Sequence, residues 1–155
     1  MFIAARNVAF ALATLVVLAG GAARADEAPA PTTGKISAQA VGLRNANGVV
    51  RCTLFAGPVG FPGDASKATK LAIATITSGQ AVCEFPNVGP GSYAIGMLHD
   101  ENNNGKMDTN FVGIPTEGYG ASNDARGSMG PPSFNSARFA FKGDAPVTLQ
   151  LKTTY

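Results

Sequence analysis

The sequence predicts an all-β protein, an antiparallel β-sandwich of about seven short strands. Beyond the first 25 residues, apolar and polar residues alternate with a period of two, and no long segment shows a helical period. The 155 residues include 19 Gly and 10 Pro without a strict repeat, which indicates many turns and excludes collagen. Because 45% of the residues are hydrophobic and only 14% are charged, the chain is expected to form a core rather than to be disordered.

The first 25 residues have the organisation of a secretory signal peptide. One basic residue, Arg6, precedes an apolar run over 8–19, and Ala23-Arg24-Ala25 offers small residues for cleavage. The run is shorter than the roughly 20 apolar residues of a spanning helix. We therefore expect cleavage after Ala25, a periplasmic or secreted protein, and no membrane span in the mature form. Residues 26–34 would be a flexible leader and 35–155 a single β-sandwich domain.

Loss of the signal peptide would also change the charge of the chain. The whole sequence has 12 Lys and Arg against 10 Asp and Glu, but Arg6 and Arg24 leave with the signal peptide. The mature chain would then be neutral. A neutral chain has no general electrostatic attraction to nucleic acid or to anionic membrane surfaces, so we expect no nucleic-acid partner.

The expected strands follow from alternation between turn signals. They cover residues 35–43, 49–55, 70–77, 80–85, 92–99, 137–142 and 147–151. The turn over 45–48 separates the first two strands, residues 64–70 could form one helical turn, and Ser78-Gly79 predicts a hairpin between the third and fourth strands. Tyr93 follows a Gly-Pro-Gly turn, where its hydroxyl could bind loop backbone as in a tyrosine corner.

Two cysteines, Cys52 and Cys83, are the only ones in the chain. Each falls on the apolar face of its expected strand. In an exported protein this pair predicts a structural disulfide, which would stabilise the fold by about 3–4 kcal/mol. Two free buried thiols or a redox pair are the alternatives, and the absence of a CxxC motif argues against the redox pair.

Residues 99–135 form one long ordered loop in this prediction, without a convincing strand. Its first part places oxygen-bearing side chains at alternate positions before a Gly, as in the first half of a helix-loop-helix calcium site. The expected ligands are Asp100, Asn102, Asn104, the carbonyl of Lys106, Asp108 and, to complete the shell, Glu117 or Asn110. Phe111 stands where that loop would use a bidentate Glu, so we expect modest calcium affinity, about 10⁻⁴–10⁻³ M. A metal-free loop held by Asx turns is the alternative.

The later part of this segment combines an aromatic residue with polar side chains on a Gly-rich background. Tyr119, Ser122, Asn123 and Arg126 form a candidate recognition loop for an envelope protein or glycan. The alternative is a loop that packs back on the sandwich.

An enzyme is the second interpretation. His99, the only His, could act as a general base beside nearby acids in a hydrolase. The acids Glu101, Glu117, Asp124 and Asp144 could supply a carboxylate pair for glycoside hydrolysis. No Ser or Cys motif accompanies His99, so we expect no catalytic residue. A purely structural envelope protein without a ligand is the third interpretation.

Residues 86–127 and 130–139, including HDENNNGKMD and GIPTEGYG, resemble a bacterial secreted family known as domain of unknown function 2141. The likeness extends from about Ile36 to Tyr155 and implies export and a β-sandwich, but no reaction. The PGxY turn also resembles prealbumin-like sandwich domains, and the strand order could be prealbumin-like or immunoglobulin-like. The family motifs fall on the expected calcium ligands, which the resemblance itself does not assign to a role.

Overall fold

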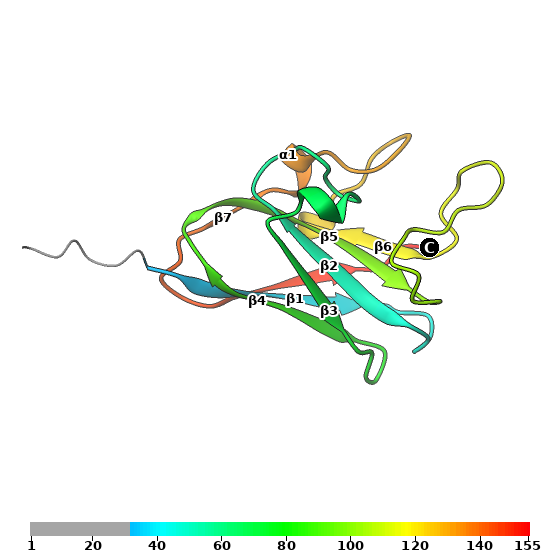
Figure 1. Cartoon of the computed structure of the whole chain (residues 1–155), viewed down its shortest axis with the longest axis horizontal. Coiled ribbons are helices and arrows are strands. Elements are labelled where there is room, and N and C mark those ends of the chain that lie inside the picture. Colours follow the sequence, from blue (N-terminus) through cyan, green and yellow to red (C-terminus); the bar gives the residue numbers. More distant parts are fainter. Residues whose placement is uncertain (1–31) are drawn as a thin grey trace, which may run out of the picture.

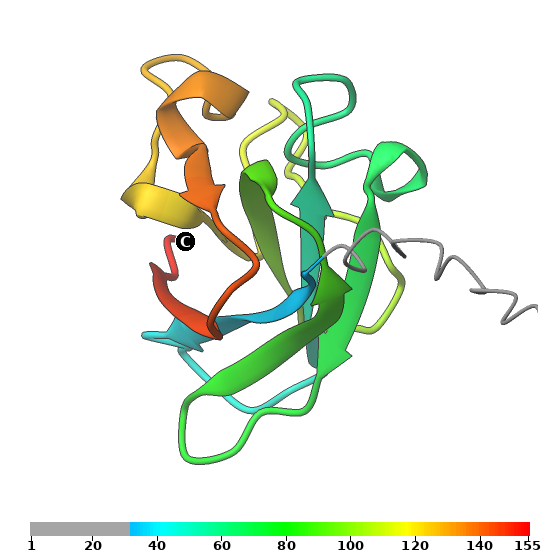
Figure 2. The same cartoon turned by 90° about the vertical axis from the view of Figure 1, so that its left-hand side faces the viewer.

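A computed structural model describes residues 32–155 and shows a sandwich of two sheets (Figures 1 and 2). The strands are β1 (Gly34–Val41), β2 (Val49–Phe55), β3 (Lys70–Ala74), β4 (Ala81–Val88), β5 (Gly91–Asp100), β6 (Gly118–Ala121), β7 (Phe139–Phe141) and β8 (Val147–Lys152). Three short helical segments, η1 (Ala65–Lys67), η2 (Ser122–Asp124) and α1 (Phe134–Ala137), connect them. The expected signal peptide and most of the leader lie outside the described residues. The all-β sandwich predicted from the sequence is confirmed.

The smaller sheet has three strands in the order β4-β1-β8. β1 pairs antiparallel with β4, with Ala38 opposite Cys83, and parallel with β8, with Ala38 opposite Leu149. The first and last strands of the domain are therefore neighbours. Gly34 already belongs to β1, so the last residue of the predicted leader is part of the sheet.

The larger sheet contains five strands, with β3-β2-β5-β6 as its continuous order. β5 is the longest strand and pairs with β2 along its length. β7 pairs with the beginning of β5 and β6 with its second half, so that His99 lies opposite Gly118. This arrangement brings the end of β5 and the start of β6 together, and the loop 101–117 connects them.

The core lies between the sheets and is formed by the inward residues of each alternating strand. Fully buried examples are Ile36, Leu54, Phe85, Ile95 and Leu151. Since successive strand residues point to opposite faces, the period of two in the sequence places these side chains in one layer. A second small cluster, Ala94, Ala121 and Ala137 with Phe61 and Phe134, lies on the other face of the larger sheet.

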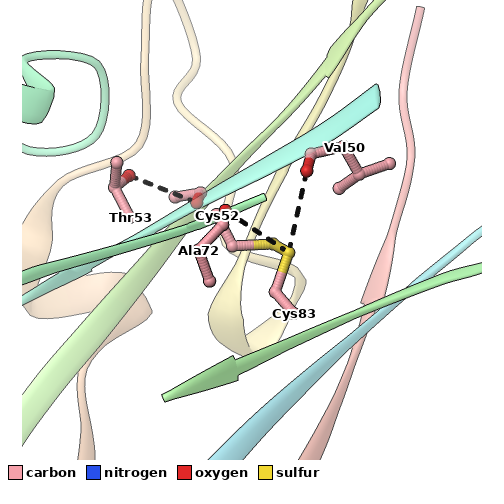
Figure 3. The surroundings of a disulfide bond; sticks show 6 residues. Val50, Cys52, Thr53, Ala72 and Cys83 are labelled. Atoms are coloured by element: carbon pink, nitrogen blue, oxygen red, sulfur yellow. Dashed lines mark hydrogen bonds between the residues drawn. A yellow bond between two sulfur atoms is a disulfide. The ribbon is translucent and has the colours of Figure 1, made fainter. Parts of the chain in front are cut away.

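The predicted disulfide between Cys52 and Cys83 is present and joins the two sheets (Figure 3). Cys52 belongs to β2 in the larger sheet and Cys83 to β4 in the smaller one. Both are buried in the core. The bond therefore crosses the apolar layer and fixes the separation of the sheets at this point.

Several local predictions are confirmed. The helical turn expected over 64–70 is η1, which begins after Asp64, whose carboxylate accepts a hydrogen bond from the Ser66 N–H. The Tyr93 hydroxyl donates to the Gly89 carbonyl over 3.1 Å, as expected for a tyrosine corner. In the part of the chain that the structure covers, no helix is long and apolar enough to cross a membrane.

Two predictions about strands are wrong. The segments 70–77 and 80–85 do not form a hairpin, because β3 pairs with β2 and β4 with β1, and only Thr77 and Gln80 bridge each other at the turn. The segment 99–135 is not one loop without a strand, because it contains β6, η2 and the first half of α1. β6 has only four residues, Gly-Tyr-Gly-Ala, and their pairing with β5 overcomes a low strand propensity.

Candidate functional site

The candidate calcium loop begins at Asp100, the last residue of β5, and ends where β6 begins. Asp100 is completely buried. A Cβ atom at Gly48 would lie 1.9 Å from the Asp100 carbonyl oxygen, so only Gly fits where the 42–48 turn crosses the end of β5. The loop therefore has its origin fixed by the sheet and by this turn.

The Asp100 carboxylate organises the first half of the loop. One oxygen accepts a hydrogen bond from the Asn104 N–H (2.9 Å), and the other accepts from the Gly105 N–H (2.8 Å) and from Nε of Arg51. Arg51 comes from β2 and also donates to the Asn103 side chain. Burial raises the pKa of Asp100, but the hydrogen bonds from Arg51, Gly105 and Asn104 together hold that pKa below its ordinary value.

The alternate polar residues point toward one another across the curled loop. Asp108 accepts from the side-chain amide of Asn102 on one oxygen (2.6 Å) and from that of Asn104 on the other (2.9 Å). The Asn102 and Asn104 side-chain oxygens accept from the backbone N–H groups of Asn104 and Lys106. Gly105, with a φ of 79°, adopts the left-handed conformation that closes the turn.

Glu117 closes the loop from its far end. One carboxylate oxygen accepts from the Glu101 N–H (2.8 Å) and the other from the Asp108 N–H (3.1 Å). Glu117 is buried and directly precedes β6. A single carboxylate thus joins the first, the middle and the last part of the loop.

A second polar cluster, centred on Arg44, contacts the loop near both of its ends. Arg44 forms an ion pair with Glu101, donates to the Thr116 carbonyl over 3.0 Å and lies over the Tyr155 ring at 4.3 Å. Burial raises the pKa of Glu101, but hydrogen bonds from Asn45 and Arg44 and the charge of Arg44 bring it below its ordinary value. Burial also raises the pKa of Tyr155.

His99 has a structural position. Its ring is completely buried, with Nδ1 2.7 Å from the Tyr155 hydroxyl and Nε2 3.0 Å from the Asn47 carbonyl. Because both ring nitrogens already have partners and no face is exposed, a substrate cannot reach the imidazole. The geometry gives no support to the hydrolase interpretation that rests on this residue.

The structure brings the expected calcium ligands into one hydrogen-bonded network. Asp100, Asn102, Asn104, Asp108 and Glu117 all belong to it, and Lys106 joins through its backbone N–H. Asn110, the alternative to Glu117, belongs instead to the next turn, where it binds Val112 and Ile114.

Such an arrangement can offer carboxylate, amide and carbonyl oxygens to a hard cation. Among residues 32–155, no three His, Cys, Asp or Glu side chains are grouped closely enough to hold a metal by themselves. A bound ion would therefore need the Asn side chains and a backbone carbonyl as well. Without an ion, the same Asn side chains satisfy Asp108.

The four candidate recognition residues differ in how exposed their side chains are. Tyr119 is half-buried in β6 and Arg126 is exposed, whereas Asn123 donates its side-chain amide to the Arg138 carbonyl. Ser122 is completely buried and cannot contact a partner, so its assignment to a recognition loop is wrong. Its hydroxyl donates to the Ala137 carbonyl (2.6 Å) and accepts from the Ile95 N–H (2.9 Å).

Sequence reasoning missed Arg51 and Arg44, which hold the two acids at the start of the loop. Alternation in β2 placed Arg51 away from the core, but 49 residues separate it from Asp100. No local pattern could have linked them. The Tyr155 side chain, 56 residues from His99, was missed for the same reason.

These features define a two-sheet, disulfide-linked β-sandwich module with a polar loop held at the end of its longest strand. The chain belongs to a bacterial family described as "uncharacterized protein conserved in bacteria (DUF2141)", whose profile matches residues 39–149. The resemblance predicted from the sequence motifs is thereby confirmed. No curated protein and no solved structure matches the chain.

Proposed function

We propose that this protein is an exported, non-enzymatic β-sandwich module whose 100–117 loop binds calcium and, in the cell envelope, supports a recognition surface formed by the segment that follows β5. One observation carries the proposal. Asp100, Asn102, Asn104 and Asp108 are spaced as in the first half of a calcium-binding loop, the two Asn side chains meet at the Asp108 carboxylate, and the Asp108 N–H binds Glu117. The signal-peptide pattern in residues 1–25 supports export, and a buried, fully engaged His99 supports a binding rather than a catalytic role.

The hydrogen bonds of the loop indicate how calcium would be accommodated. In the loop as described, the amide groups of Asn102 and Asn104 donate to Asp108. Rotating each amide about its terminal bond presents its oxygen in place of its nitrogen, toward an ion held by Asp108, and gives up the bonds that the Asn104 and Lys106 N–H groups donate to these oxygens. Arg51 binds one oxygen of Asp100, and the other oxygen accepts a single hydrogen bond, from the Asn104 N–H. Only Asp100, Asp108 and Glu117 supply charge, which fits a weak rather than a tight site.

The test is thermal unfolding with chelator and with calcium. With a dissociation constant of about 10⁻⁴–10⁻³ M, about 10 mM calcium stabilises the folded state by about 1.4–2.7 kcal/mol. For a domain of this size that corresponds to a rise in Tm of roughly 5–10 °C. Magnesium, which requires a stricter octahedral shell, should have a smaller effect.

Two variants make the test specific to the loop. Asp108→Asn removes a charged ligand and should abolish most of the calcium-dependent rise in Tm. Asp144→Asn makes the same change at an exposed acid without an ion pair in the described part of the chain, and should keep the rise. An unchanged Tm of the unsubstituted protein at about 10 mM calcium would contradict the proposal.

A further inference from the structure

The second half of the 100–117 loop forms a short hairpin-like projection, in which Thr109 and Pro115 bridge each other, and we call residues 108–116 the finger. Figure 1 shows it extending from the right-hand end of the sandwich, away from the start of β1. Phe111 is 98% exposed at its tip, and Val112 and Ile114 are also exposed. The neighbouring 126–132 loop carries Met129, which is fully exposed. Large apolar side chains gathered at loop tips are typical of an interaction site.

The finger is internally hydrogen-bonded. The Asn110 side-chain oxygen accepts from the N–H groups of Val112 and Ile114, its carbonyl accepts from Gly113, and its own N–H donates to the Ile114 carbonyl. At the base, the Thr116 N–H donates to the Asp108 carbonyl. Pro115 has no N–H. Most backbone N–H groups of the tip therefore already have a partner within the finger. A segment that enters an apolar medium has to meet this condition, because water is not there to bind its N–H groups.

The distribution of charged residues around the finger also favours a lipid partner. Residues 109–116 and 127–137 contain no charged side chain. Lys106 and Arg126, which precede these two segments, are exposed and have no ion pair within residues 32–155. Asp124 pairs with Lys152, whereas Asp108 and Glu117 keep their charge and are hydrogen-bonded by amide groups at the base of the finger. Glu117 is buried and Asp108 half-buried, so the exposed charges beside the tip are the two basic ones. An uncharged apolar tip flanked by exposed basic side chains complements the hydrocarbon edge and anionic headgroups of a bilayer.

The surface between the finger and the 126–132 loop supports the same partner. A groove there is lined by Phe61, Met107, Ile114, Tyr119 and Met129, with no charged residue in its lining. A glycan would need several convergent polar groups, which this groove does not offer. Acyl chains need none.

We propose that the finger inserts into the interface of an anionic lipid bilayer, with Phe111, Val112 and Ile114 among the acyl chains and Lys106 and Arg126 at the headgroups. This names the partner of the recognition surface in the proposed function, but insertion does not depend on calcium, because Asn110 holds the tip. The expected binding is peripheral and reversible, since only one tip enters the bilayer.

The experiment is co-sedimentation with phosphatidylglycerol-containing and pure phosphatidylcholine vesicles. The chain is expressed whole and purified as its host processes it, so all variants share the same N-terminus. Binding is measured with chelator present, which separates it from the calcium proposal, and repeated with calcium. We expect binding to the anionic vesicles, weakened about tenfold or more by Phe111→Ser, because a buried aromatic side chain is lost.

A matched pair controls for general hydrophobicity. Val112→Thr and Val82→Thr make the same change at two exposed valines, one on the finger and one on β4 of the other sheet. Only Val112→Thr should reduce binding, and thermal unfolding should show both variants folded. Equal binding by Phe111→Ser and the unsubstituted protein, or no binding to anionic vesicles with chelator, would overturn the inference. Phe111-dependent self-association without vesicle binding would also overturn it, in favour of a protein contact.

Discussion

Replacing Ser122 by Ala should destabilise the protein far more than its small size suggests. The Ser122 hydroxyl is the hydrogen-bond partner of two buried backbone groups, the Ile95 N–H in β5 and the Ala137 carbonyl at the end of α1. Ser122 and both partner residues are fully buried. Without the hydroxyl, each of the two groups loses its bond where water cannot replace it.

The magnitude follows from these two bonds. A buried polar group left without a partner costs about 1–3 kcal/mol, so the loss of both bonds should lower the free energy of unfolding by about 2–6 kcal/mol. That is a large part of the roughly 5–15 kcal/mol that stabilises a typical domain. With an m-value of about 2 kcal/mol/M, the urea midpoint should move down by about 1–3 M.

The assay is equilibrium urea unfolding of Ser122→Ala beside a matched control. Ser128→Ala makes the same change at an exposed serine with no hydrogen bond in the described structure, and should change stability by less than about 0.5 kcal/mol. If the two variants unfold at the same urea concentration, the Ser122 hydroxyl does not stabilise the contact between β5 and α1. A recognition role for Ser122 would then need to be reconsidered.

Two other predictions concern the ion pair between Asp100 and Arg51 and the disulfide between Cys52 and Cys83. Because hydrogen bonds hold the pKa of Asp100 below its unfolded value, its contribution to stability is present above about pH 4 and is lost as the pH falls through the lower, folded pKa. Urea unfolding across pH 2–6 should show this loss reduced in Arg51→Met, and an unchanged pH dependence would contradict the pairing. The double variant Cys52→Ala, Cys83→Ala should lose about 3–4 kcal/mol because the bond closes a 31-residue separation, and a loss below 1 kcal/mol would show that the link does not constrain the unfolded chain.

Much of the fold could be predicted because its information is local. Alternation placed Cys52 and Cys83 on inward faces, and the structure joins them across the core. The turn before Tyr93 predicted its hydrogen bond to the backbone four residues earlier. Such patterns depend on neighbouring residues, which a single sequence shows directly.

The rest depended on contacts between distant segments. Alternation in 70–77 and 80–85 indicates two strands but not the sheet to which each belongs, so the sequence predicts a hairpin where the chain turns from one sheet to the other. In the candidate site, oxygen spacing predicted which residues of the loop would meet. The arginine that holds Asp100 comes from β2, and the exposed tip at Phe111 was visible only as an exception to the calcium pattern.

The position of β1 has a consequence for the order in which the protein can assemble. β1 lies between β4 and β8, so its sheet has no second neighbour for β1 until residues 147–152 are available. β1 is the first strand of the domain and β8 is the last. One edge of β1 therefore stays unpaired until almost the whole domain is available. Because such distant pairings slow folding, the smaller sheet is completed only when β8, at the end of the domain, pairs with β1.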